Sequence, residues 1–129
     1  MATTAPLTAP ANDENNWTWM LISPRGRVGR STYVAGSIAL VFGLILFVKL
    51  LQATVGTESM LATVLWPPVC LGSLWALAML QIKRWHDRGR SGLWMLLSAV
   101  PIIGPIWSFV ELVLLPGDVL DNTYGPPPS

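Results

Sequence analysis

Charged side chains are scarce in this 129-residue sequence: Asp, Glu, Lys and Arg make up 12% of it, and hydrophobic residues make up 52%. Water-soluble domains carry about 25% charged residues. The chain therefore has too few charges to cover a water-exposed surface. Its net charge of +1 lacks the strong local basicity of nucleic-acid-binding domains, so no nucleic-acid partner is predicted.

Cysteine and histidine occur once each, as Cys70 and His86. A structural zinc site needs about four nitrogen or sulfur ligands, so we predict no metal site. His86 and Asp87 are adjacent, and adjacent side chains do not face each other on a helix. The sequence also lacks a phosphate-binding loop, a serine elbow and an HExxH motif. We therefore predict no enzyme, no catalytic residue and no cofactor.

The first sixteen residues contain no Lys or Arg and no apolar run. They lack the two features that open a signal peptide. Their small and polar composition buries almost no apolar surface, so residues 1–16 are predicted to be a disordered tail. Residues 17–126 then form the membrane domain, and residues 127–129 a short tail. Residues 17–22 (WTWMLI) are either an interfacial anchor or a segment that packs on the other helices.

Three apolar runs of 23 residues dominate the rest of the chain. Residues 33–55 contain one charge, residues 60–82 contain none, and residues 93–115 contain one. A helix rises about 1.5 Å per residue, so each run is about 34 Å long and can cross a bilayer. We predict an all-α integral membrane helical bundle with three transmembrane helices at these positions.

The third run is interrupted by Pro101 and Pro105. Proline removes a backbone donor and bends a helix, so we predict one kinked crossing. The alternative is a turn at these prolines, which gives a re-entrant, four-segment form. In the crossing form Lys49 and Glu111 lie at similar depth and form a candidate intramembrane ion pair. In the re-entrant form that pair is impossible.

Two basic segments flank the apolar runs. Arg25, Arg27 and Arg30 precede the first run, and the loop at residues 83–92 carries four more Lys or Arg residues. The turn around Glu58 carries none. Positive loops stay in the cytoplasm, so the N-terminus and the 83–92 loop are predicted to be cytoplasmic. Three crossings then place the C-terminal tail outside.

These basic segments allow a second interpretation besides topology. The planar fork of arginine matches phosphate oxygens, so the cytoplasmic surface is a candidate site for an anionic lipid headgroup or another anionic ligand. The candidate site consists of Arg27, Arg30, Arg84, His86, Asp87, Arg88 and Arg90.

Four ordered motifs resemble a known family. Residues 26–33 resemble its GRxxRxxY opening, and residues 84–94 its RxHDxGxSGxW loop. Residues 101–104 are similar to its PxIG step, and residues 116–126 to its closing PGT…NxYGP segment. The chain is thereby identified as similar to the domain-of-unknown-function 805 family. The resemblance implies a small, multi-pass protein of the bacterial inner membrane, and it implies no activity.

The function predicted from these observations is a non-enzymatic membrane component or accessory subunit. Ala35, Ala39 and Gly43 recur every four residues and would let another helix approach closely. The expected partners are the lipid bilayer and either a second copy or another membrane protein. The alternatives are a component of a transport system, because broken spans recur in transporters, and the anionic headgroup binder.

Overall fold

The computed structural model describes residues 16–128, and over this range the chain is helical, with one isolated bridge between Asn122 and Gly125 and no β-strand. The all-α prediction is confirmed for these residues. The predicted disordered tail, apart from Asn16, lies outside the described residues.

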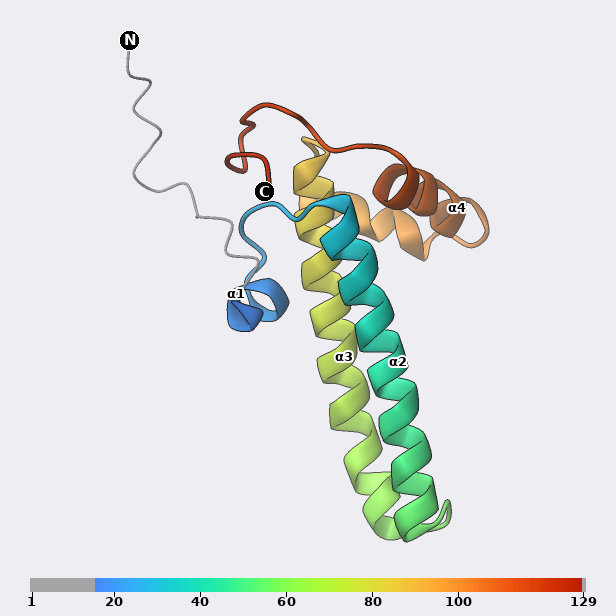
Figure 1. Ribbon diagram of the computed structural model, residues 1–129. Coiled ribbons are helices and arrows are strands. Elements are labelled where there is room, and N and C mark those ends of the chain that lie inside the picture. Colours follow the sequence, from blue (N-terminus) through green and yellow to red (C-terminus); the bar gives the residue numbers. More distant parts are fainter. Residues whose placement is uncertain (1–15, 129) are drawn as a thin grey trace.

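Two long helices form the stem of the molecule. Helix α2 (Arg30–Val55) and helix α3 (Met60–Asp87) run side by side and are joined by a short turn (Figure 1). Both are long and apolar enough to cross a membrane. None of the residues of α2 is buried by the rest of the chain. A helix that is apolar on all sides is stable only when something else covers it, and lipid is the usual cover.

Helix α2 contacts α3 through a face that does not include the stripe of small residues. A Cβ atom added at Gly36 would lie 3.1 Å from Leu80, so α2 faces α3 at this position. The stripe formed by Ala35, Ala39 and Gly43 stays exposed instead, and no atom lies within 4 Å of a Cβ added at Gly43. The small-residue stripe is therefore open to a helix from outside the chain.

The predicted single kinked crossing over residues 93–115 is not confirmed, and the chain takes the alternative form with a turn at the prolines. The chain forms a 3-10 helix η1 (Gly92–Ala99), turns, and returns as α4 (Ile103–Phe109) and the π-helical η2 (Val110–Leu114). The turn bends sharply at Ile102, where φ is +69°, and the Ile103 N–H donates to Pro101 O over 2.8 Å. Neither half reaches the length of about 17 residues that a crossing needs. The three-crossing count is therefore not confirmed.

The folded-back segment projects sideways from the end of the stem (Figure 1). Gly104 makes this possible, because a Cβ atom there would collide with the carbonyl group of Leu97 in η1. The two halves also share a hydrogen bond of 2.8 Å between the hydroxyl groups of Ser98 and Ser108. The turn at the two prolines is thus fixed by contacts between residues seven to ten positions apart.

Both ends of the described chain lie at the same end of the stem (Figure 1). Helix α1 (Trp17–Ile22) packs against α3, which agrees with the packing interpretation of this segment. The tail after η2 comes back over the start of α2, where Pro128 lies 3.7 Å from a Cβ added at Gly29. Three crossings would place the tail at the opposite end of the stem from residues 24–30. In the structure the tail lies at the same end as these residues.

Candidate functional site

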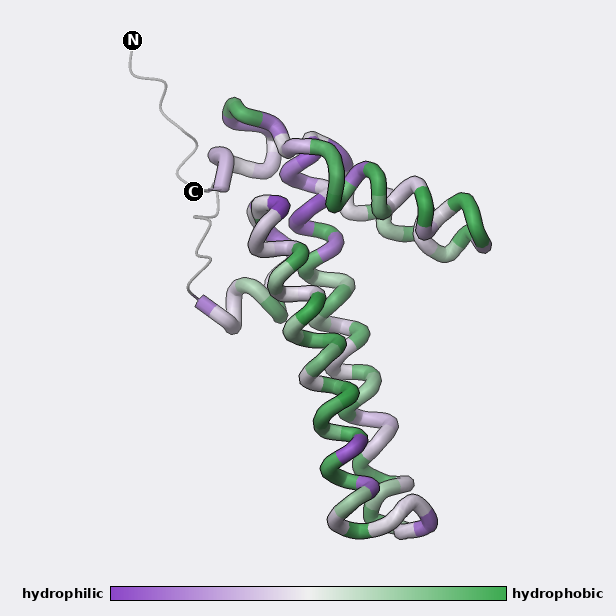
Figure 2. The backbone as a smooth tube through the Cα atoms, turned by 45° about the vertical axis from the view of Figure 1, so that its right-hand side comes forward, coloured by the Kyte–Doolittle hydropathy of each residue, from purple (hydrophilic) through white to green (hydrophobic). Residues whose placement is uncertain are grey.

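The charged residues at the end of α3 are helical, which corrects the prediction of a loop over residues 83–92. Helix α3 continues to Asp87 and ends where Gly89 adopts φ +67°. The Gly89 N–H then donates to His86 O, and the Arg90 N–H donates to Trp85 O. This pattern closes a helix around a left-handed glycine. Figure 2 shows the hydrophilic colour gathered here, above stem helices that are hydrophobic along most of their length.

Asp87 is the centre of the site. It is 3% exposed, and both of its carboxylate oxygens accept hydrogen bonds from buried arginines. The Oδ1 atom accepts from Arg27 Nε at 3.2 Å and from Arg27 Nη2 at 2.9 Å. The Oδ2 atom is paired with Arg84 Nη1. Two buried positive charges are therefore held by one buried negative charge.

Arg27 uses all of its N–H groups inside the protein. Besides the two bonds to Asp87, Nη1 donates to Leu120 O at 2.9 Å and to Gly125 O at 3.1 Å. Its Nη2 also donates to Asp118 O. Five N–H groups thus meet five bonds, which is the full capacity of a guanidinium group. Arg27 fastens the C-terminal tail and has no donor left for a ligand.

Arg84 fastens the segment before the tail. Its Nε donates to Leu112 O at 2.8 Å, and its Nη2 donates to Leu115 O at 2.7 Å. The backbone of Asp87 adds a third attachment, because its carbonyl accepts from the Asp118 N–H at 2.7 Å. One turn of α3 therefore holds both η2 and the tail. We call Arg27, Arg84 and Asp87 with these carbonyl partners the clasp.

A glycine allows the tail to come this close. A Cβ atom at Gly117 would collide with the carboxylate of Asp87. The side chain of Asn122 completes the contact, since its Nδ2 donates to His86 O and to Asp118 Oδ2, both at 2.9 Å. Gly117 and Asn122, which belong to the closing motif of the sequence, are therefore the residues through which the tail contacts the end of α3.

His86 and Lys83 hold the N-terminal segments. His86 Nδ1 lies 3.0 Å from Gly26 O and must donate, because a carbonyl oxygen only accepts. The imidazole ring stacks on Tyr124 with centroids 3.9 Å apart and planes 3° apart. Lys83 Nζ donates to the carbonyls of Trp19 and Met20 in α1, both at 2.6 Å. His86 is thus engaged in packing rather than aimed at open space.

The sequence did not predict three contacts of this site: that of Lys83 with α1, that of Gly117 with Asp87, and that of Tyr124 with His86. An available signal was the set of turn-forming residues Asn122, Tyr124 and Gly125, which predicts an ordered turn in the tail against the membrane surface. Nothing in the sequence tied that turn to α3.

Glu111 pairs with the arginines that follow α3, so the predicted pair with Lys49 is wrong. Arg88 donates to Glu111 Oε2 from Nε at 3.1 Å and from Nη2 at 2.9 Å, and Arg90 lies 3.4 Å from Oε1. Arg30 Nη1 donates to Leu114 O at 3.2 Å, which places η2 beside the start of α2. Lys49 is 19 residues further along α2, which is about 28 Å away at the helical rise.

The residues of the predicted anionic site therefore fall into two groups, one buried and one at least partly exposed. Arg27, Arg84 and Asp87 are buried and bonded internally. His86 is half-buried and engaged with Gly26 and Tyr124. Arg30 is exposed, and the side chains of Arg88 and Arg90 are 20% and 33% exposed. Within residues 16–128, no group of three or more His, Cys, Asp or Glu side chains could hold a metal ion.

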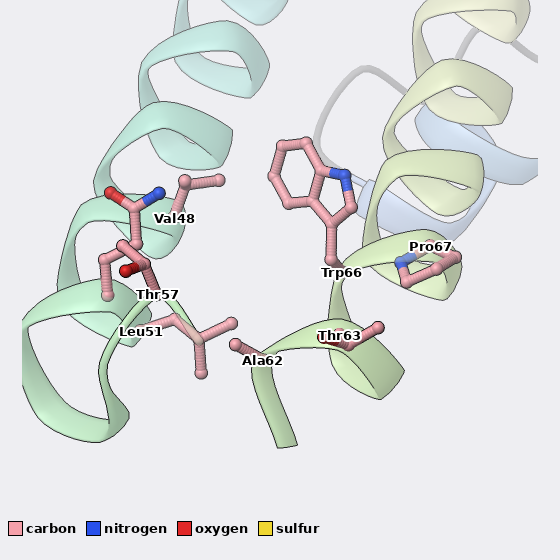
Figure 3. Close-up of a pocket in the computed structure, with 8 residues that line it drawn as sticks. Val48, Leu51, Thr57, Ala62, Thr63, Trp66 and Pro67 are labelled. Atoms are coloured by element: carbon pink, nitrogen blue, oxygen red, sulfur yellow. The ribbon is translucent and has the colours of Figure 1, made fainter. Parts of the chain in front are cut away.

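A cleft of about 390 Å³ lies at the opposite end of the stem, near the turn that joins α2 and α3. Figure 3 shows the Trp66 ring standing between the two helices, on the side facing Val48. Gln52, Thr57 and Thr63 supply its polar atoms, and none of its lining residues is charged. The cleft has no group that could serve as a general acid or base.

Comparison with known proteins gives one match. A family model described as "Protein of unknown function (DUF805)" matches residues 21–126. No curated protein and no solved structure matches the chain. The matched range holds the charged end of α3, the folded-back segment and all of the residues of the clasp.

Proposed function

The chain belongs to the DUF805 family of proteins of unknown function, and on that premise we propose that it is a non-enzymatic component of the bacterial inner membrane. In this proposal α2 and α3 cross the bilayer, and the charged end remains in the cytoplasm. The supporting observation is the contrast between α2, which is apolar and has no buried residue, and the clasp, which buries its charges at one end.

The distribution of positive charge supports the orientation. Every Lys and Arg except Lys49 lies at the charged end, whereas the turn between α2 and α3 carries only Glu58. Lys- and Arg-rich segments stay on the cytoplasmic side of a membrane. Because Arg27 holds the tail, both the N-terminal segment and the tail belong on that side.

The buried polar groups of the clasp bond one another and backbone carbonyls, and this favours a structural role over catalysis or ligand binding. The buried arginines and Asp87 are occupied by one another and by backbone carbonyls. The exposed stripe of Ala35, Ala39 and Gly43 offers a surface on which a helix can approach closely. The role proposed is lateral association in the membrane, with a second copy or with another membrane protein.

Topology can be tested with single cysteines in a Cys70→Ala background. Thr57→Cys is expected to react with a membrane-impermeant maleimide in intact spheroplasts, because Thr57 is exposed in the outer turn. Asp121→Cys, which is exposed in the tail, is expected to react only after lysis. The chain should also stay in the membrane pellet after alkaline carbonate washing. Labelling of Asp121→Cys in intact spheroplasts would restore the three-crossing topology.

Association can be tested by oxidative crosslinking in native membranes. Ala39→Cys, on the small-residue stripe, is expected to give a disulfide-linked homodimer or an adduct with another membrane protein. Val41 is exposed and lies about 160° away around α2 at 100° per residue, so Val41→Cys serves as the control and should give much less product. Equal product from both positions, or none from either, would refute association through this stripe.

A further inference from the structure

We propose that residues 92–114, the folded-back segment of η1, α4 and η2, form a wedge that lies in the cytoplasmic leaflet alone. The partner of the wedge is the acyl chain and headgroup boundary of that leaflet. The consequence is that the protein favours membranes in which this leaflet is on the convex side. The inference rests on the proposed crossing of the bilayer by α2 and α3.

The outward surface of the wedge is apolar. Leu93 is 74% exposed and Ile102 is 77% exposed, and neither is covered by another part of the described chain. Ile106, Trp107 and Phe109 are exposed as well. An apolar surface of this extent marks an interaction site rather than a surface in contact with water.

The polar side chains of the wedge point inward. Ser98 and Ser108 bond to each other between its two halves, and Gln81 of α3 donates to Ser98. Ser108 is buried. The backbone is helical on both sides of the turn, so most of its N–H and C=O groups are satisfied locally, as lipid requires. Polar groups inside and apolar groups outside are the opposite of what a water-soluble segment shows.

The depth of the wedge is fixed by its base. Arg88 and Arg90 hold Glu111, and Arg84 holds the carbonyl of Leu112, so the base lies among charged groups. The guanidinium of Arg90 lies 4.7 Å from the ring centre of Trp94. Tryptophan beside arginine suits the boundary between headgroups and acyl chains. The charged base thus places the wedge at the membrane surface, not at the bilayer centre.

The tip of the wedge carries a backbone conformation that needs support. Ile102 has φ +69°, which is costly for a β-branched residue. Such conformations persist where the surroundings fix them, and they gather at functional positions. Pro101, Ile102 and Ile103 at this tip are all exposed. An apolar tip held in a strained turn fits insertion into lipid.

The wedge makes the molecule wider in one leaflet than in the other. Among the described residues α1, η1, α4 and η2 all lie at the charged end, and only α2 and α3 reach the turn near Glu58 (Figure 1). Figure 2 shows the wedge, mostly in hydrophobic colour, projecting from the hydrophilic end of the stem. Apolar segments that lie in one leaflet expand it, and their binding depends on curvature.

The preference can be measured with the full chain, fluorescently labelled at Asp121→Cys and reconstituted into vesicles of one lipid composition with a range of diameters. Only vesicles with an externally quenchable label, and hence the charged end outside, are counted. Protein density per membrane area is expected to rise severalfold from the largest to the smallest vesicles. A density independent of diameter would overturn the proposal.

Two variants and one control make the result specific. Gly104→Ala should abolish the preference, because the added Cβ collides with the carbonyl of Leu97 and forces the two halves apart. Ile102→Glu places a charge on the exposed tip without touching the packed base, and it should have the same effect even if Gly104→Ala folds poorly. Gly72→Ala adds its Cβ where no atom lies within 4 Å and should retain the preference.

The depth of Ile102 separates this inference from the proposed function. A fluorophore on Ile102→Cys, in a Cys70→Ala background, should be quenched by lipid-bound quenchers and not by aqueous iodide. Quenching by iodide in a chain that resists carbonate extraction would overturn the wedge and leave the membrane crossing intact. Extraction of the chain by carbonate would overturn both.

Discussion

Replacement of Asp87 by Asn is expected to prevent the protein from accumulating in folded form. Asparagine keeps the shape of the side chain but removes the one negative charge that faces Arg27 and Arg84, and all three residues are buried. Removing one partner of a buried ion pair costs about 3–5 kcal/mol, which is a large share of the roughly 5–15 kcal/mol that stabilises a typical domain. The measurement is the amount of protein in the membrane and its thermal midpoint in detergent.

The control for this experiment is Asp121 in the C-terminal tail. Asp121 is exposed and takes no part in the salt bridges of the clasp. Asp121→Asn therefore removes the same charge from a side chain that is in contact with water. Its thermal midpoint should match that of the unmodified chain. If Asp87→Asn were equally stable, the clasp would not be what holds the charged end together.

Replacement of Arg27 by Lys is expected to release the C-terminal tail. The ammonium group of lysine has three donors on one atom, and it cannot reach Asp87 and the carbonyls of Leu120 and Gly125 as the guanidinium does. Each buried acceptor left without a donor costs about 1–3 kcal/mol. Limited proteolysis with mass spectrometry should show rapid cleavage within residues 116–128 of the variant and slow cleavage in the unmodified protein.

Arg25→Lys is the matched control, since Arg25 lies two residues away and is exposed. Its proteolytic pattern should be unchanged. A tail that stays protected in Arg27→Lys would mean that the stacking of His86 on Tyr124 and the bonds of Asn122 suffice to hold it.

Sequence reasoning located the two long helices well, because length and apolar composition are local properties. The first expected run, residues 33–55, lies within α2, and the second, residues 60–82, lies within α3. The end of α3 was missed because its last residues are charged, and a charged stretch between apolar runs indicates a loop. Those charges are tolerated at the buried end of α3 only because their partners come from positions 19–20, 27 and 112–118.

The partners of the site residues were also missed, because they are distant in the sequence. The sequence identifies the arginines as topology determinants, with an external anion as the second interpretation, but it does not identify the backbone carbonyls that they bond. A guanidinium group bonds carbonyl oxygens as well as phosphate oxygens, and composition does not tell which of them is near. The turn at Pro101 depends on the close approach of Gly104 to the carbonyl of Leu97, a contact that the proline pattern does not reveal.

The attachment of the tail to Arg27 sets an order of events during synthesis. A ribosome makes residues 118–125 after both arginines of the clasp, and until then no carbonyl from that segment can accept from Arg27. In the proposed topology, Arg27 and Arg84 carry unpaired positive charges during this interval, and such charges favour retention on the cytoplasmic side. The emerging tail then covers them. In the proposed orientation, the same two residues first favour retention of their segments on the cytoplasmic side and later hold the tail and η2 in the finished fold.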